Sequence, residues 1–520
     1  MTIETARAGH MLEQAHWAAR AYSTFDAASV QRIVHAVADV AFANSERYAE
    51  WAVRETEMGV VGDKVIKNQA CSKGLLDYYA GHDFVSPRID EQHKIVQIPR
   101  PAGVVLAVTP TTNPVASVYF KILLALMTRN AVVVAPHPRA KECCADAARL
   151  LGAAAEEAGA PIGIVQVVEQ PSIPLMTALM TDERTDVIVA TGGTEVVRAA
   201  YSSGNPALGV GPGNVPVMVD HTADIKAAAE HIVASKAFDN SVLCTNESVL
   251  VVEESVADAL LRAMSHAGAH VLDAEATDKL RGYMFFGGHL NTEVVGKDAS
   301  WIAERAGFRV TPKTRLLIAP LEGVLPDDPM THEKLSPVLG LVKVPDVQRG
   351  IDSCRAVVRA AGAGHSAAIH SEDAATIMEF TARVPVLRVS VNIGNSTGSS
   401  GLGTNLAPSM TIGTGFVGRS SIGDNLEPGH LLNWAKIAYN ADDRVPMGNF
   451  AGLDPARAPR GRTPAYPTPS NASAGATQSS ALGARVEAAV AGRLPRGATD
   501  QFRDEIRKLV AEELSQLMKG

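Results

Sequence analysis

Short runs of apolar residues alternate with helical patterns between residues 103 and 220 of this chain. Strands are expected where Val, Ile and Leu are dense, and helices where apolar residues recur every three or four positions. The expected strands lie at 103–109, 130–138, 163–168, 186–190, 207–210 and 215–220, and the expected helices at 117–127, 140–155, 173–180 and 191–201. This alternation is typical of a parallel, doubly wound sheet, which binds ligands at the carboxyl ends of its strands.

A second alternating region follows and runs to about residue 420. Its expected helices lie at 225–237 and 254–267, and its expected strands at 248–252, 316–320, 339–344, 367–370 and 387–392. The first 80 residues have helical patterns, and residues 88–100 alternate polar and apolar residues as a strand does. We therefore expect two doubly wound α/β domains, residues 1–220 and 221–424, and then a return segment at 425–452.

The last part of the chain differs in composition. Residues 453–480 are rich in Pro, Ser, Ala and Gly, which predicts a flexible linker without a core. Within 481–520, one helical face is apolar and consists of Phe502, Ile506, Leu509, Val510, Leu514, Leu517 and Met518. An isolated helix of this length is marginally stable in water, so the apolar face implies a partner.

Composition excludes several classes of function. The 520 residues carry a net charge of −8, so no basic field favours nucleic acid. No run of about eighteen apolar residues predicts a membrane span, and the polar N-terminus is not a signal peptide. The five cysteines are few and scattered, which fits free thiols in a cytoplasmic protein, and their spacing predicts no metal site.

Cys244 stands in a short polar turn between the expected helix 225–237 and the expected strand 248–252. A cysteine at such a junction can hold its sulfur in a cleft. Taken alone, a single free cysteine is more often a small buried hydrophobic residue. The surrounding motifs favour a reactive thiol instead.

Four other stretches carry a resemblance to a known family: PTTNP at 110–114, TGGTEVVRAA at 191–200, GVGPGN at 209–214 and HEKLSPVL at 332–339. With Cys244 they resemble the aldehyde dehydrogenase superfamily. They are most similar to its CoA-acylating branch, which includes the aldehyde dehydrogenase half of bifunctional aldehyde–alcohol dehydrogenases. The similarity covers about residues 15–440. It implies an NAD(P)-binding domain at 1–220, a catalytic domain at 221–424 and a small β oligomerisation arm.

The resemblance assigns catalytic roles to three residues. Cys244 matches the nucleophile, which attacks an aldehyde and carries a thioester after hydride has left to a nicotinamide. Asn113, through its side-chain amide, and the Cys244 N–H are expected to stabilise the oxyanion. His365 matches a histidine that the acylating branch keeps near the cysteine, where it would deprotonate a thiol or steer the cofactor. Read without the family, His365 is equally well a packed histidine, and Asn113 before a proline is a common turn.

The cofactor contacts are assigned in the same way. Gly192, Gly193 and Thr194 form a turn before a helix, where backbone N–H groups favour phosphate. Glu333 matches the glutamate that binds the nicotinamide ribose. His137 stands where hydrolytic members carry a lysine, and with Arg139 nearby it leaves NAD and NADP both open. The other expected cofactor contacts are Thr111 and Gly211.

One absence indicates how the thioester is released. Hydrolytic members carry a glutamate that activates water, but the matching stretch here is GVGPGN, with Val210 or a neighbour in that place. No carboxylate lies between Glu195 and Asp220. Hydrolysis without a base should be slow, so coenzyme A is the expected second substrate and an acyl-CoA the product. The alternatives are a hydrolytic enzyme with another base and a non-catalytic scaffold recruited through its tail.

The tail carries a second resemblance. A linker followed by an amphipathic helix is similar to the encapsulation peptides of bacterial microcompartment cargo enzymes. This implies a shell protein or another cargo enzyme as partner, and a place in the cytoplasm within a microcompartment. An oligomerisation helix is the alternative. The family commonly forms homodimers and homotetramers, and the sequence leaves the aldehyde open among propionaldehyde, acetaldehyde, lactaldehyde and functionalised short aldehydes.

Overall fold

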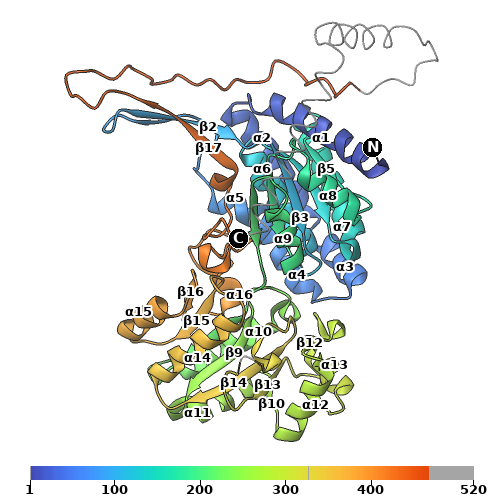
Figure 1. Ribbon diagram of the computed structural model, residues 1–520, viewed down its shortest axis with the longest axis vertical. Coiled ribbons are helices and arrows are strands. Elements are labelled where there is room, and N and C mark those ends of the chain that lie inside the picture. Colours follow the sequence, from blue (N-terminus) through green and yellow to red (C-terminus); the bar gives the residue numbers. More distant parts are fainter. Residues whose placement is uncertain (1, 326, 468–520) are drawn as a thin grey trace, which may run out of the picture. The chain divides into compact units, whose positions relative to one another are not determined.

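The structure is a computed structural model, and it describes residues 2–325 and 327–467. Two parallel sheets, of five and seven strands, form its α/β architecture, together with a three-stranded arm and a short hairpin (Figure 1). The predicted α/β fold with parallel sheets is therefore confirmed. The predicted helices at 481–520 lie outside the described residues. In the described part of the chain, no helix combines the length and apolar character that crossing a membrane requires.

The five-stranded sheet has strongly apolar strands that are buried at its centre. In sheet order the strands are β5 (Val165–Val167), β4 (Ala131–Pro136), β3 (Val104–Thr109), β6 (Val187–Thr191) and β7 (Ala207–Val210), all parallel. Its strands are joined by α6 (Pro114–Met127), η2 (Pro138–Ala140), α7 (Lys141–Glu157), α8 (Ile173–Thr181) and α9 (Thr194–Tyr201). Continuous apolar strands of this kind are typical of a parallel sheet covered on both faces.

The N-terminal segment is helical, as expected. It consists of α1 (Ile3–Tyr22), α2 (Ala27–Ala43), α3 (Ser45–Thr56), α4 (Val61–Gln69), η1 (Ala70–Gly74) and α5 (Leu75–Tyr78). Thr2 and Asp26 accept hydrogen bonds from the first turns of α1 and α2, which explains where these two helices begin. The buried alanine, valine and isoleucine side chains of α1 and α2 join the core that surrounds the five-stranded sheet.

The seven-stranded sheet is also entirely parallel. Its order is β10 (Ala269–Val271), β13 (Leu316–Pro320), β14 (Val338–Val344), β9 (Glu247–Glu253), β8 (Val215–Val219), β15 (Ala367–His370) and β16 (Val389–Val391). The elements among and after these strands are α10 (Ile225–Ala237), η3 (Phe238–Ser241), α11 (Glu254–His266), α12 (Ala274–Met284), β11 (Phe285–Phe286), β12 (His289–Leu290), η4 (Thr292–Val294), α13 (Ala299–Arg305), η5 (Pro329–Thr331), α14 (Val347–Ala360), α15 (Ala374–Arg383), α16 (Asn395–Gly398), η6 (Phe416–Gly418) and η7 (Pro428–Leu431).

The chain changes sheets earlier than the expected boundary at 220. It leaves the first sheet after Val210 and enters the second at Val215, so β8 belongs to the seven-stranded sheet. The reason is the GVGPGN stretch, whose glycines and proline end β7 and allow the chain to cross. The remaining domain boundaries stay predictions.

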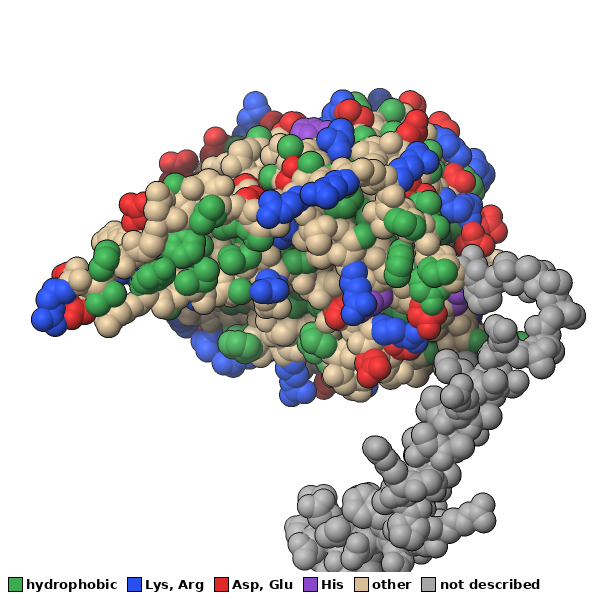
Figure 2. Space-filling view, turned by 90° about the horizontal axis from the view of Figure 1, so that it is seen from above, with side chains coloured by type: hydrophobic (Ala, Val, Ile, Leu, Met, Phe, Trp, Pro, Cys, Tyr) green, Lys and Arg blue, Asp and Glu red, His purple; other side chains and the backbone are tan. Residues whose placement is uncertain are grey.

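The expected single strand at 88–100 is instead a hairpin of β1 (Arg88–Asp90) and β2 (Ile95–Pro101). The polar residues between them turn the chain: the Asp90 carboxylate accepts a hydrogen bond from the His93 amide at 2.9 Å, and Lys94 has a positive φ of 53°. β17 (Leu432–Ala438) pairs antiparallel with β2 and completes the arm. Hydrophobic side chains gather on this arm in the view from above (Figure 2). Its role in oligomerisation stays a prediction.

The start of the expected flexible linker is bound to the N-terminal helices. Arg457 exchanges backbone hydrogen bonds with Thr24 and Asp26, at 2.9 and 3.1 Å. Further along, the Trp17 indole donates to the Pro464 carbonyl at 2.8 Å. Backbone and aromatic contacts thus hold residues 457–466 against the N-terminal helices, while the linker character of the remaining residues to 480 stays a prediction.

Candidate active site

A cleft of about 650 Å³ lies where the carboxyl ends of strands in the first sheet face loops of the second. Such strand ends are the usual ligand-binding edge of a parallel sheet. Most of the site residues expected from the sequence line this cleft, namely Thr111, Asn113, His137, Gly192, Gly193, Gly211, Cys244 and Glu333. Three others, Arg139, Thr194 and His365, are not part of its lining.

Cys244 follows a turn with an unusual backbone. Asp239, Asn240 and Ser241 have positive φ angles of 50°, 50° and 64° in succession. Residues other than glycine rarely adopt this conformation, and each instance costs about 1–3 kcal/mol. Side-chain bonds compensate for this cost, since Asn240 donates to the Gly296 carbonyl at 3.0 Å and Lys236 donates to the Ser241 hydroxyl at 2.7 Å.

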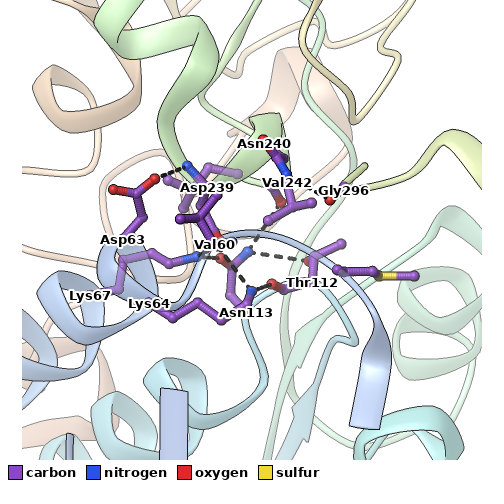
Figure 3. A network of polar contacts seen from close by, with 12 residues as sticks. Val60, Asp63, Lys64, Lys67, Thr112, Asn113, Asp239, Asn240, Val242 and Gly296 are labelled. Carbon is purple, nitrogen blue, oxygen red and sulfur yellow. Dashed lines mark hydrogen bonds and ion pairs between the residues drawn. The ribbon is translucent and has the colours of Figure 1, made fainter. Parts of the chain in front are cut away.

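Asp239 provides the strongest of these attachments. Its buried carboxylate accepts hydrogen bonds from the Val60 amide at 2.7 Å and from Lys64 at 3.0 Å, and it pairs with Lys67 (Figure 3). Lys64 and Lys67 lie on α4, and Val60 is the residue before it. The turn that precedes Cys244 is therefore bound to a helix far away in the sequence.

The Cys244 thiol is protonated at neutral pH in this arrangement. Burial and then the nearby Glu333 carboxylate raise the pKa of Cys244 to about 12, while the charges of Arg388 and Lys67 oppose this shift. Since the thiolate is the nucleophilic form, the cysteine requires a proton acceptor or an added positive charge in the cleft before it reacts.

Glu333 is the carboxyl group that faces this thiol in the cleft. Burial raises the pKa of Glu333 to about 8, and the charge of Lys236 opposes this shift. Among the described residues that line the cleft, the only other carboxylate is that of Glu195, which pairs with Arg198 at 3.0 Å. Val210 presents an apolar side chain to the cleft, as the missing glutamate of the GVGPGN stretch predicts.

His365 lies behind the cleft rather than on its wall. A Cβ added to Gly213 would lie 2.1 Å from the Cys244 carbonyl oxygen and 3.3 Å from Cε1 of His365, so both groups pack against this glycine. Burial, and then the charge of Arg388, lower the pKa of His365 to about 3, so the ring is neutral. Its Nδ1 lies 2.9 Å from the Ser366 hydroxyl, and Nε2 has no hydrogen-bond partner among the described residues.

Asn113 is the residue before α6, beside the nucleophile turn. Its Oδ1 accepts a hydrogen bond from Lys67, and its Nδ2 lies 3.2 Å from the Thr112 hydroxyl and 3.3 Å from the Val242 carbonyl (Figure 3). The side-chain amide thus contacts Val242, two positions before Cys244 in the chain, and both Asn113 and Cys244 line the cleft. Lys64, Lys67 and Asp239 carry no sequence motif that predicts this network, although Asp239 lies in the stretch that leads to the cysteine.

The opposite wall of the cleft fits a dinucleotide. Gly193 precedes α9 and Thr194 begins it, and the described residues provide no side-chain cap for the N–H groups of this helix end. An added Cβ at Gly193 or Gly211 would have no atom within 4 Å, so a phosphate has room to approach the backbone. The expected contact of Arg139 is not in this cleft. Its side chain instead lines a neighbouring pocket of about 260 Å³ with Lys297, Trp301 and Arg305, because η2 turns it away from the strand ends.

Most of this chain matches one protein family. The model of the Aldehyde dehydrogenase family matches residues 2–404. The chain belongs to the aldehyde dehydrogenase family. Among curated relatives of this aldehyde dehydrogenase, the bifunctional aldehyde-alcohol dehydrogenase of Escherichia coli is 36% identical over 441 residues, which cover 84% of this chain and 50% of that protein. The chain thus spans about half the length of that relative.

Other relatives are similar over nearly their whole length. The succinate-semialdehyde dehydrogenase (acetylating) of Clostridium kluyveri is 35% identical, and the match covers 84% of this chain and 96% of that protein. Among solved structures, an acetylating aldehyde dehydrogenase from Geobacillus thermoglucosidasius has a TM-score of 0.83 at 36% identity, covering 85% of this chain and 98% of that one.

Two more distant structures are also similar. A propionaldehyde dehydrogenase from Rhodopseudomonas palustris, solved with bound CoA and an acylated cysteine, has a TM-score of 0.76 at 27% identity, covering 83% of this chain and 97% of that chain. A propionaldehyde dehydrogenase from the fucose utilisation bacterial microcompartment of Clostridium phytofermentans has a TM-score of 0.75 at 26% identity, covering 83% and 97%.

Replacing Glu333 by Gln should accelerate alkylation of Cys244 by iodoacetamide at pH 9, by about three- to tenfold. At this pH Glu333 is ionised, and its charge raises the pKa of the Cys244 thiol. At pH 6.5 Glu333 is already mostly protonated, so the two proteins should react at similar rates. Mass spectrometry of the labelled peptide measures the rate, with Cys244→Ser as the blank, since the other four cysteines are buried. Equal rates at pH 9 would contradict this electrostatic contact.

Gly213→Ala should displace the nucleophile turn, because the new Cβ would overlap the Cys244 carbonyl oxygen. We expect the free energy of unfolding to fall by about 1–3 kcal/mol. Gly211→Ala is the matched control, since an added Cβ there meets nothing within 4 Å, and its stability should change by less than about 0.5 kcal/mol. Urea unfolding of both variants measures this difference, and equal stabilities would show that the close approach at Gly213 is not needed.

Proposed function

We propose that this aldehyde dehydrogenase is CoA-acylating: it oxidises a short-chain aldehyde with NAD(P)+ and releases the product as an acyl-CoA. The observation that carries the proposal is the cleft around Cys244, in which an apolar Val210 stands where a water-activating carboxylate would be needed. The similarity to acetylating enzymes, and to a structure with CoA and an acylated cysteine, supports it.

In the proposed reaction, the Cys244 thiol gives its proton to the Glu333 carboxylate, its sulfur attacks the aldehyde carbon, and the carbonyl oxygen becomes an oxyanion. Asn113 Nδ2 and the Cys244 N–H donate hydrogen bonds to this oxygen. A bound nicotinamide supplies the acceptor for the hydride that leaves the same carbon. The thiol of CoA then attacks the resulting thioester on Cys244, the C–S bond to the enzyme breaks, and acyl-CoA leaves while the proton of the CoA thiol passes to the Cys244 sulfur.

The wall of the cleft at the start of α9 would hold the dinucleotide. Gly192 and Gly193, with the open N–H groups of α9, would bind its phosphates, and Thr111, His137 and Gly211 line the same space. Glu333 would bind the nicotinamide ribose, as the family pattern implies. Burial and then Arg139 lower the pKa of His137, so this side chain is an uncharged neighbour for the adenosine end, whether the cofactor is NAD or NADP.

His365 fits a positioning role better than that of a general base. A proton acceptor whose pKa is about 3 is poorly matched to a thiol whose pKa is about 12. Glu333, with a pKa of about 8, is the better matched acceptor in the same cleft. We propose that His365 supports the main chain of Cys244 through Gly213, which both groups contact.

Glu333 also gives a specific basis for a second candidate function, the hydrolytic enzyme. A carboxylate that is partly ionised at neutral pH could activate water against the thioester, and the product would then be a free carboxylic acid. CoA release remains the first proposal because Glu333 is also the expected ribose contact, and the overall similarity to acylating relatives supports it.

We further propose a homo-oligomer that assembles through the arm of β1, β2 and β17, and a microcompartment location directed by residues 481–520. The arm exposes Ile89 and Ile437, at 40% and 37% of their surface, which is consistent with a contact surface. The similar enzyme from a Clostridium phytofermentans microcompartment supports the location.

NAD(P)H formation from propionaldehyde should depend on added CoA, and mass spectrometry should identify propionyl-CoA as the product. The reason is the slow hydrolysis of the Cys244 thioester in a cleft without a dedicated base. Cys244→Ser should abolish turnover, which also excludes a non-catalytic scaffold. Equal rates without CoA, with propionate as the product, would favour the hydrolytic function instead.

Deletion of residues 482–520 should leave kcat and KM unchanged within about twofold and remove co-sedimentation with microcompartment shells. The deleted residues carry the predicted apolar face and none of the cleft residues. A full-length variant with Leu509, Leu514 and Leu517 changed to Ser is the matched control and should behave like the deletion. Retention of the truncated enzyme in purified shells would refute targeting by this segment.

A further inference from the structure

Lys67 is a buried cation with contacts on two sides. It lies on α4 with 1% of its surface exposed, and it donates hydrogen bonds to Asn113 Oδ1 and to Asp239 Oδ2 (Figure 3). Asn113 belongs to the loop after β3, in the five-stranded sheet, and Asp239 to the turn before Cys244. One ammonium group therefore joins the two parts of the chain that meet at the reacting sulfur.

The contact with Lys67 determines which way the Asn113 amide faces. An ammonium group donates and cannot accept, so the amide oxygen must face Lys67 and the amide nitrogen must face away from it. The nitrogen then lies beside the nucleophile turn, where its two contacts are long, at 3.2 Å to Thr112 and 3.3 Å to Val242. Because these contacts are long, the N–H groups remain available to a stronger acceptor at the same side of the amide, such as an oxyanion.

The charge of Lys67 has a second effect on the same amide. A cation at Oδ1 polarises the carboxamide and strengthens its N–H groups as donors, because hydrogen bonds in a buried chain reinforce one another. The partner carboxylate of Asp239, which is fully buried, holds the ammonium in place. The Asp239 carboxylate is closely packed against the backbone of Gly59, since a Cβ on this glycine would lie 2.1 Å from Asp239 Oδ1.

We propose that Lys67 is a positioning residue for the oxyanion donor, acting through Asn113 and anchored by Asp239. It fixes the orientation of the Asn113 amide and its distance from the Cys244 turn. The inference rests on the proposed function in so far as Cys244 forms an oxyanion with an aldehyde, a step that the acylating and the hydrolytic reactions share.

Lys64 provides a matched control within the same helix. It is 3% exposed and donates to the same Asp239 carboxylate at 3.0 Å, but its other contact is the Thr112 carbonyl at 3.1 Å rather than the Asn113 side chain. Burial, and then the charge of Lys67, lower the pKa of Lys64 to about 8. Loss of Lys64 thus disturbs the ion pair without removing the group that orients Asn113.

The test is a double-mutant cycle on aldehyde-dependent NAD(P)H formation. Lys67→Met should lower kcat by about 10- to 100-fold and change the KM for aldehyde by less than about threefold, because the oxyanion exists in the transition state and not in the free aldehyde. Asn113→Ala should lower kcat by about 100- to 1,000-fold. The double variant should be no slower than Asn113→Ala within about threefold, since Lys67 acts through that residue. Lys64→Met should lower kcat by less than Lys67→Met does.

Two results would overturn the proposal. If the losses of Lys67→Met and Asn113→Ala multiply in the double variant, Lys67 acts independently of Asn113. If Lys64→Met and Lys67→Met lower kcat equally, the shared ion pair with Asp239 carries the effect. Should Lys67→Met fail to fold, Lys67→Gln replaces it in the cycle. It keeps a donor for Asn113 Oδ1 but loses the charge that polarises the amide, so it should lower kcat by a smaller factor than that expected of Lys67→Met. This loss should also vanish in the Asn113→Ala background, and a loss that persists there would overturn the proposal.

The failure of this inference is distinguishable from that of the proposed function. A wild-type enzyme that makes a free acid without CoA refutes CoA release. Its NAD(P)H formation can still be measured in the double-mutant cycle of Lys67 and Asn113. A wild-type enzyme that shows CoA-dependent turnover and a multiplicative cycle refutes the role of Lys67 alone. A wild-type protein with no aldehyde oxidation refutes both.

Discussion

The geometry of the active site depends on one buried carboxylate. Asp239 accepts hydrogen bonds from two lysines and a backbone amide while its own backbone, and that of the next two residues, is left-handed. Three such residues cost several kcal/mol together, and charge-assisted hydrogen bonds in a buried site are the interactions strong enough to offset this cost. The position of the Cys244 sulfur is thus set by packing between α4 and the turn, and not by the local preference of the turn itself.

The secondary structure could be predicted well where a pattern is local. The predicted bounds of α10 agree with the structure, because helix starts and apolar spacing are local signals. Residues 88–100 predict a single strand because polar and apolar residues alternate without interruption across the polar turn. That turn forms through a side-chain bond of Asp90, which the alternation does not reveal.

The candidate site could be predicted where a residue belongs to a family motif. It could not be predicted where the role of a residue depends on its burial in the folded chain. Cys244, Asn113 and Glu333 stand in the family's motifs and meet in one cleft. On α4 the usual pattern is inverted, since Lys64 and Lys67 are buried while Ile66 is 51% exposed. A helix whose charged face is buried requires a counter-charge, and here it comes from a residue more than 170 positions away. The raised pKa of Glu333 and the lowered pKa of His365 could not be predicted either, because they follow from burial in the folded chain and, for His365, also from the charge of Arg388.

The protonated state of the resting Cys244 has a consequence for the life of the enzyme in a cell. Peroxides oxidise thiolates and leave thiols nearly untouched, so a cysteine whose pKa is about 12 is poorly reactive toward hydrogen peroxide until the cleft is occupied. Sulfenic acid should therefore accumulate slowly on the idle enzyme. The desolvation that makes the nucleophile dependent on its ligands for activation also protects it from oxidative damage between turnovers.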